Sequence, residues 1–128
     1  MSQIISKKIN ILIVDDNPDN IQVAANFLIE QGYNISFDLD GTKVLQHLKS
    51  VKSDLILLDI MMPEMDGYEA MKRIRSQIKF RNLPIIALTA KAMKDDKQKC
   101  IDAGANDYIT KPIYIERLLS LMRVWLSK

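Results

Sequence analysis

The sequence has little of several residue types, and each scarcity excludes a class of protein. Its single cysteine, Cys100, rules out an internal disulfide and any metal site built on several cysteines. The net charge of +2 is too small to predict binding to nucleic acid or to an anionic membrane. No apolar run approaches membrane-spanning length, and the first eight residues do not resemble a signal peptide. We therefore expect a protein of the reducing cytoplasm.

The residues that are present are typical of one globular unit. A chain of 128 residues with 48% hydrophobic and 27% charged residues is long enough to bury one core. No repeat, linker or low-complexity segment divides it. We expect residues 1–128 to form a single domain.

Short apolar runs alternate with segments of helical periodicity. Asn17 is the expected N-cap of the first helix, with Pro18 at its first position, and Ile78 is expected to point inward from the third. The predicted strands cover residues 9–14, 33–40, 54–59, 83–89 and 107–111. The predicted helices cover residues 18–31, 42–51, 67–78, 92–103 and 113–127.

Five strands that alternate with five helices predict an α/β fold. The third and fourth strands are continuously apolar, as in strands covered on both faces, whereas the second alternates apolar and polar residues, as at a sheet edge. We expect a five-stranded parallel sheet in the order 2-1-3-4-5, with helices on both faces, which is the flavodoxin-like doubly wound arrangement.

Polar residues end the central strands of this predicted sheet. Along the chain they are Asp15 and Asp16, Asp59, Thr89 and Lys111. In an open parallel sheet, ligands bind at this edge, near the point where the strand order reverses. Each residue alone has a plainer interpretation, such as a helix cap, a strand end or a solvated lysine. Their convergence on one crevice makes Asp59 a candidate nucleophile, a metal ligand or both.

The charges in this crevice do not balance. Three carboxylates and one lysine leave about two negative charges without a partner, which is costly in a partly buried site. An all-oxygen cluster without histidine or cysteine favours Mg²⁺ or Mn²⁺ over zinc. A divalent cation beside a lysine suits phosphoryl transfer, because both offset the charge of phosphate oxygens. In that setting a carboxylate is able to attack phosphorus and form an aspartyl phosphate.

Five separated motifs surround these residues. They are Asp15-Asp16, Asp59 followed by Met62-Pro63 and Met65-Asp66-Gly67, Leu88-Thr89-Ala90, Gly104-Ala105-Asn106-Asp107-Tyr108, and Lys111-Pro112. In this order they resemble the receiver domain of two-component response regulators, including the chemotaxis regulators of that family. The resemblance runs from about Ile9 to Leu126 and is specific, because a lone pair of aspartates would not define it.

The resemblance implies a metal site and a phosphoacceptor. Asp59 would accept the phosphoryl group. Asp16 and Asp59 would bind Mg²⁺ together with the backbone carbonyl of Met61 and with Asp15, directly or through water. Lys111 would pair with the bound phosphoryl group, and the Lys111–Pro112 peptide would be cis.

It also implies a switch. The hydroxyl of Thr89 would turn to the phosphoryl oxygen, and Tyr108 would move inward to fill the space that is vacated. Ala90, a small residue, would leave room for the phosphoryl group. No catalytic activity beyond loss of its own phosphoryl group is expected.

The expected partners are proteins. The donor would be a histidine kinase or a histidine phosphotransfer protein, which receivers meet near Val23 and Phe27 of the first helix. The output would be a downstream protein target or a homodimer formed through the fourth helix, fifth strand and fifth helix. The last helix has too many apolar residues for one buried stripe, so Trp125 and its neighbours either cover the sheet edge or contact a protein.

Several alternatives remain. The chain is a stand-alone receiver, a receiver excised from a hybrid histidine kinase, or a receiver used as a scaffold without phosphorylation. A haloacid-dehalogenase-type phosphatase is disfavoured because Met61 stands where that family has a second aspartate. A flavodoxin-like cofactor binder lacks support because no phosphate-binding loop follows the first strand. We interpret His47 as a solvated surface residue and Cys100 as packed against the sheet.

Overall fold

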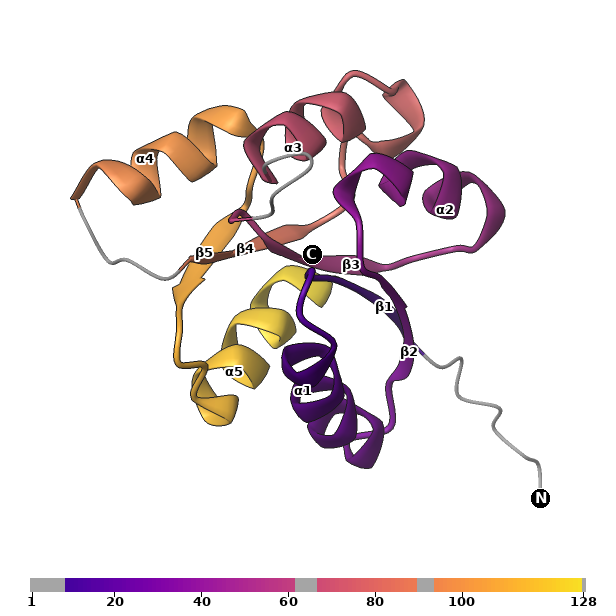
Figure 1. The fold of residues 1–128 in the computed structure, drawn as a ribbon, viewed down its shortest axis with the longest axis vertical. Helices are drawn as coiled ribbons and strands as arrows, with labels where there is room; N and C mark the ends of the chain where they lie inside the picture. Colours follow the sequence, from indigo (N-terminus) through magenta and orange to yellow (C-terminus); the bar gives the residue numbers. More distant parts are fainter. Residues whose placement is uncertain (1–8, 62–66, 90–93, 128) are drawn as a thin grey trace.

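The fold is an open α/β sandwich around a parallel sheet (Figure 1). A computed structural model describes residues 9–61, 67–89 and 94–127. Ala90, whose small side chain was predicted to leave room for a phosphoryl group, lies outside these ranges, as do residues 62–66 and the expected start of the fourth helix.

Five parallel strands form the sheet. They are β1 (Asn10–Val14), β2 (Asn34–Asp38), β3 (Leu55–Asp59), β4 (Ile85–Thr89) and β5 (Asp107–Thr110). Every adjacent pair is parallel, and the order is β2-β1-β3-β4-β5. The predicted strand order is thus confirmed. The reversal of order lies between β1 and β3, where the chain first builds outward to β2 and then crosses back.

Helices cover both faces of the sheet. They are α1 (Pro18–Glu30), α2 (Val44–Ser50), α3 (Gly67–Arg75), α4 (Lys94–Ala103) and α5 (Ile115–Leu126). Two short 3-10 turns, η1 (Gly41–Lys43) and η2 (Ile78–Phe80), precede α2 and β4. In Figure 1, α2, α3 and α4 lie on one side of the sheet, and α1 and α5 lie on the other.

The alternation of strand side chains produces two cores. One core packs alternate residues of β1, β3 and β4 against α2, α3 and α4, and it contains the buried Cys100 as predicted. The other packs the intervening strand residues against α1 and α5. Because β1, β3 and β4 are buried on both faces, their ends are held rigidly at the carboxyl edge of the sheet.

The third helix is shorter than its periodicity predicts. The helix α3 ends at Arg75, and Ile78, which was expected to point inward, is 82% exposed. Phe80 of η2 fills the core instead. The cause is Arg75, whose Nη1 donates to the carbonyl oxygens of Phe80 and Leu83 at 2.8 and 2.6 Å and so draws the chain around its guanidinium group.

The prediction for His47 is wrong. The imidazole lies on α2, largely out of solvent, with Nδ1 3.0 Å from Oδ2 of Asp38 at the end of β2. Polar neighbours along the chain gave no sign of this contact, because the partner belongs to another element.

None of the helices in the described ranges has the length and apolarity needed to span a bilayer.

Candidate functional site

The loop after β1 carries a buried carboxylate. Asp15 is 1% exposed, and its Oδ1 accepts a hydrogen bond from the backbone N–H of Asn17 at 2.9 Å. Asn17 in turn caps α1, since its Oδ1 accepts from the N–H of Asp19 at 2.9 Å, with Pro18 at the first helical position. The predicted cap is therefore confirmed, and the same tight turn orients Asp15. Asp16 is exposed beside it.

The end of β3 carries the second buried carboxylate. Asp59 is 4% exposed, and its Oδ1 accepts from the backbone N–H of Met61 at 3.0 Å. Behind it, Gly67 begins α3 so close to the strand that a Cβ atom there would overlap Ile60 and lie 2.9 Å from the carbonyl oxygen of Asp59. Only glycine allows this approach, which places α3 directly behind the carboxylate.

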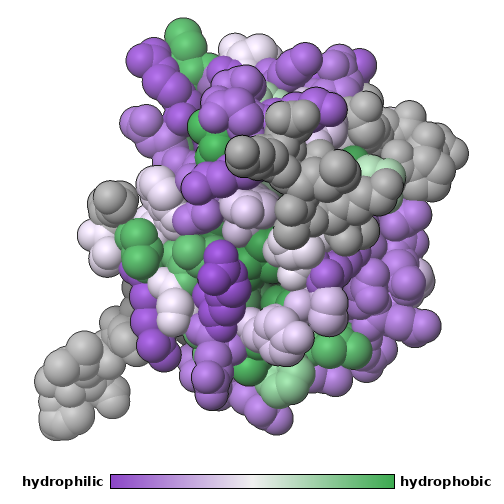
Figure 2. Space-filling model, turned by 90° about the vertical axis from the view of Figure 1, so that its left-hand side faces the viewer, coloured by the Kyte–Doolittle hydropathy of each residue, from purple (hydrophilic) through white to green (hydrophobic). Residues whose placement is uncertain are grey.

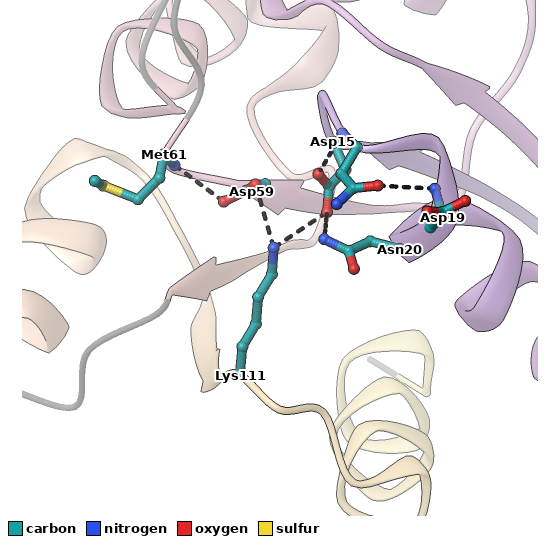
Figure 3. A network of polar contacts seen from close by, with 7 residues as sticks. Asp15, Asp19, Asn20, Asp59, Met61 and Lys111 are labelled. Carbon is teal, nitrogen blue, oxygen red and sulfur yellow. Dashed lines mark hydrogen bonds and ion pairs between the residues drawn. The ribbon is translucent and has the colours of Figure 1, made fainter.

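Lys111, just after β5, joins the two carboxylates (Figure 3). Its Nζ lies 3.2 Å from Oδ2 of Asp15 and 3.3 Å from Oδ2 of Asp59. The backbone N–H of Lys111 donates to the carbonyl oxygen of Thr89 at 2.7 Å, which fixes the residue against β4. The Lys111–Pro112 peptide is cis, as the resemblance predicted.

The surroundings of these groups perturb their protonation. Burial raises the pKa of Asp59, and the nearby charge of Asp15 adds to this, while the N–H of Met61 and the ammonium of Lys111 oppose it. For Lys111, burial works against the charged form, but Asp15 and Asp59 together outweigh it and raise the pKa of the ammonium. The carboxylate of Asp59 is thus a poorly solvated, more basic group than an ordinary aspartate.

The acidic residues are close enough to share one cation. Carboxylate oxygens of Asp15, Asp16 and Asp59 all lie within 4.8 Å of one another. The donor set is entirely oxygen, and two of its members are buried, which fits a hard divalent ion such as Mg²⁺. The structure therefore brings together the three aspartates that the sequence predicted as metal ligands.

Thr89 and Tyr108 lie on one face of the sheet. Thr89 is buried at the end of β4, on the same side as Ala87, since strand side chains alternate. Tyr108 pairs with Ala87 across β4 and β5, and its half-buried ring packs against the core beneath α4. The side chains of Thr89 and Tyr108 therefore lie on the same face of the sheet. The side chain of Met61, by contrast with the buried Thr89, is exposed to solvent.

Sequence reasoning missed two residues of the site. Asn20, one turn into α1, donates from Nδ2 to Oδ2 of Asp15 at 3.4 Å. Asp38 supports the same loop, because its carbonyl oxygen accepts from the backbone N–H of Asp15 at 3.1 Å. The spacing of Asn20 from the cap was the only available signal, and the contact of Asp38 depends on sheet pairing that no local pattern encodes.

An apolar groove adjoins the site. It has a volume of about 290 Å³, runs between α1 and the start of α5, and has Asp15 and Lys111 at one end. Val23 and Phe27 line it from α1 and are 60% and 45% exposed. Figure 2, which faces the left-hand side of Figure 1, shows apolar side chains gathered in the lower half of the molecule among hydrophilic ones.

Fold and site together define a class of protein. It is a flavodoxin-like α/β domain with an acidic cluster and a lysine at the switch point of the sheet. The chain belongs to the response regulator receiver domain family, which it matches over residues 11–123. The family is one of signalling domains of two-component systems, so the resemblance seen in the sequence is confirmed.

Individual relatives agree with this assignment. The chain is 36% identical over 114 residues to the probable transcriptional regulator ycf29 of Porphyra purpurea, a match that covers 89% of this chain and 54% of the relative. Three other curated relatives are matched over 9% to 49% of their length. The chain therefore spans about half, or less, of the length of these proteins.

Solved structures agree as well. The receiver domain of the sensor histidine kinase PA1611 from Pseudomonas aeruginosa, which has a magnesium ion coordinated in the active site cleft, is 37% identical with a TM-score of 0.87. That match covers 95% of this chain and all of the other. A co-crystal structure of the Saccharomyces cerevisiae histidine phosphotransfer signaling protein Ypd1 with the receiver domain of Ssk1 gives 32% identity, a TM-score of 0.87 and coverage of 94% and 90%.

Proposed function

We propose that this domain accepts a phosphoryl group on Asp59 from a phosphohistidine donor and passes the signal on by a change of surface. The observation that carries the proposal is the cluster of three aspartates within 4.8 Å, two of them bonded to Lys111. A domain of this family with that cluster has the nucleophile, the cation ligands and the lysine that phosphoryl transfer requires.

The transfer step follows from the position of Asp59. A carboxylate oxygen of Asp59 attacks phosphorus in line with the P–N bond of the donor. The new O–P bond forms as the P–N bond breaks. The electron pair of the P–N bond goes to the imidazole nitrogen of the donor. Because burial leaves Asp59 poorly solvated and raises its pKa, less solvent has to be removed from the oxygen when it attacks.

The neighbouring residues handle the charge. Lys111, already 3.3 Å from Oδ2 of Asp59, pairs with the phosphoryl oxygens after transfer. Asp15, Asp16, Asp59 and the backbone carbonyl of Met61 would hold Mg²⁺, or Mn²⁺ in its place. When bound, the ion supplies positive charge that offsets the charge on the phosphoryl oxygens.

The apolar groove suits the docking of the donor. A phosphohistidine protein must bring its imidazole to Asp59, and the groove between α1 and α5 opens next to Asp15 and Lys111. The exposed Val23 and Phe27 offer apolar contact area there. We propose that a histidine kinase or a histidine phosphotransfer protein docks at this place.

The output surface would consist of α4, β5 and α5. The hydroxyl of Thr89 would turn to the phosphoryl group and Tyr108 would follow it inward on the shared face of the sheet. The change would control a downstream protein or a homodimer, whether the domain works alone or as part of a hybrid kinase. A nearly complete switch of this kind requires roughly 5 kcal/mol of differential stabilisation.

The proposal is tested by incubation with acetyl phosphate and Mg²⁺. We expect intact mass to show an adduct of one phosphoryl group in the wild type and none in Asp59→Asn. We also expect no adduct when the metal is chelated before acetyl phosphate is added. Size-exclusion chromatography of the same samples shows whether phosphorylation drives dimerisation. An unmodified wild-type chain, or an adduct that persists in Asp59→Asn, would contradict the proposal and favour a scaffold role.

A further inference from the structure

A lysine of α4 lies over the aromatic ring of Tyr108. The Nζ of Lys97 is 5.9 Å from the centroid of the ring, within the range of a cation–π contact. Only one other such contact, between Lys79 and Phe80, occurs in the described part of the chain, and those two residues are adjacent in sequence. The contact of Lys97 instead joins two elements, α4 and β5, which are separated along the chain by the end of the helix and a loop.

Helix geometry explains why Lys97 reaches the ring. Lys97 precedes Cys100 by three residues, so the two side chains share one face of α4. Cys100 is fully buried in the core against which Tyr108 packs. The backbone of Lys97 is therefore held close to the sheet, while its exposed side chain extends over the half-buried ring.

The other end of α4 is fixed. The Nε of Arg75 donates to the carbonyl oxygen of Gly104 at 2.9 Å, and its Nη2 donates to Oδ1 of Asn106 at 2.8 Å. The same Asn106 Oδ1 accepts from the backbone N–H of Ile85 at 2.8 Å. The exit of α4 is thus bound to α3 and to β4, so an adjustment of α4 relative to β5 is easier at the Lys97 end than at the Gly104 end.

We propose that Lys97 is a positioning residue that holds Tyr108 half-buried beneath α4 and opposes its inward turn. The inference rests on the proposed function, in which Tyr108 moves toward Thr89. An inward turn takes the ring away from the ammonium of Lys97, so the contact is lost in the turned state. Removing the charge of Lys97 therefore favours the turned state and, with it, phosphorylation of Asp59.

The expected effect is modest and measurable. An exposed cation–π contact corresponds to a change of about two- to fivefold in an equilibrium or rate. We expect Lys97→Met to raise the rate of phosphorylation by acetyl phosphate with Mg²⁺ by that factor. Lys97→Arg, which keeps a cation above the ring, should retain the wild-type rate.

Fluorine NMR of the chain labelled with 3-fluorotyrosine supplies a second readout. The resonance of Tyr108, assigned as the one missing in Tyr108→Phe, should shift in Lys97→Met and stay in place in Lys97→Arg. Lys99→Met is the matched control, because Lys99 is an exposed lysine of the same helix, and its loss changes the net charge equally. In a Tyr108→Leu background, Lys97→Met should no longer change the rate.

Three results would overturn the inference. They are a Lys97→Met variant that matches Lys99→Met in both readouts, a shifted resonance with an unchanged or lower rate, and an undiminished rate effect in the Tyr108→Leu background. If the wild type itself forms no adduct, the proposed function fails, while the Tyr108 resonance in Lys97→Met still reports whether the contact exists.

Discussion

The charged groups at the two edges of the sheet have opposite kinds of partners. At the amino edge, the guanidinium of Arg75 has no carboxylate partner among the described residues. Its acceptors are neutral, namely the carbonyl oxygens of Phe80, Arg81, Leu83 and Gly104 and the amide oxygen of Asn106. At the carboxyl edge, Asp15 and Asp59 crowd one another, and Lys111 is their shared cation. The first arrangement satisfies its charge with fixed dipoles, and the second leaves negative charge in excess.

The difference separates stability from function. Arg75 donates five hydrogen bonds to the α3–β4 and α4–β5 connections, so its loss would remove the guanidinium donor from part-buried carbonyl oxygens such as those of Leu83 and Gly104. The carboxylates of the site compete for one lysine, so an additional cation bound there would reduce their mutual repulsion. We therefore expect substitutions at the amino edge to lower stability and substitutions at the carboxyl edge to change chemistry with little loss of stability.

The largest effect is expected for Arg75→Met. Burial lowers the pKa of this guanidinium, yet arginine remains charged at neutral pH, so its bonds are charge-assisted. We expect a loss of about 3 kcal/mol in the free energy of unfolding, measured by urea denaturation. Arg73→Met is the control, because Arg73 is exposed and its Nε lies 3.5 Å from a carboxylate oxygen of the similarly exposed Glu69. Its cost should stay below about 0.5 kcal/mol, and equal costs for the two variants would contradict the comparison.

A smaller effect of opposite sign is expected for Asp59→Asn. The pKa of Asp59 is raised mainly by burial, so the folded state favours the protonated carboxyl group. Stability is therefore lost as the pH rises from the ordinary pKa of 3.8 through the folded value, and the ionised group is a cost at neutral pH. The uncharged asparagine should stabilise the fold by about 1 kcal/mol at pH 7. The gain should shrink as the pH falls toward 3.8, and a variant less stable than wild type at pH 7 would count against this account.

The smallest effect concerns Lys111. Its pKa is raised because the two carboxylates outweigh the opposing effect of burial, so its ion pairs stabilise the fold below the ordinary lysine pKa of 10.5. That contribution should disappear as the pH rises through the higher folded value. We expect less than about 1 kcal/mol of alkaline destabilisation in the wild type that is missing in Lys111→Gln, measured as the difference between their unfolding free energies across this range. Parallel pH profiles would show that Lys111 gains nothing from the carboxylates.

The sequence was sufficient for the features that depend on local patterns. Asp15, Asp59 and Thr89 end apolar strands, so their position at one edge followed from the strand order alone. The cap of Asn17 and the edge position of β2 were predicted for the same reason. The roles of these residues in metal binding and phosphorylation remain predictions, to be tested by the adduct experiment.

Features set by distant partners escaped prediction. Arg75 looked like one of several basic residues in the last turn of α3, but its acceptors lie between 5 and 31 residues further along the chain. The hydrogen bonds to these acceptors change the path of the chain after α3, so that Ile78 is exposed and Phe80 is buried. His47 of α2 contacts Asp38 of β2, a different element. In each case a side chain contacts a distant part of the chain. Hydrophobic periodicity carries no information about such contacts.

The bond between Lys111 and Asp15 joins residues 96 positions apart. A ribosome adding roughly 5 to 20 residues per second needs several seconds or more to make the intervening chain. For roughly the second half of that interval Asp15 and Asp59 are both present in the nascent chain while Lys111 is not, because Lys111 follows Asp59 by 52 residues. A chain whose translation stops between residues 59 and 111 therefore contains both carboxylates but lacks the lysine that pairs with them, so its site is incomplete.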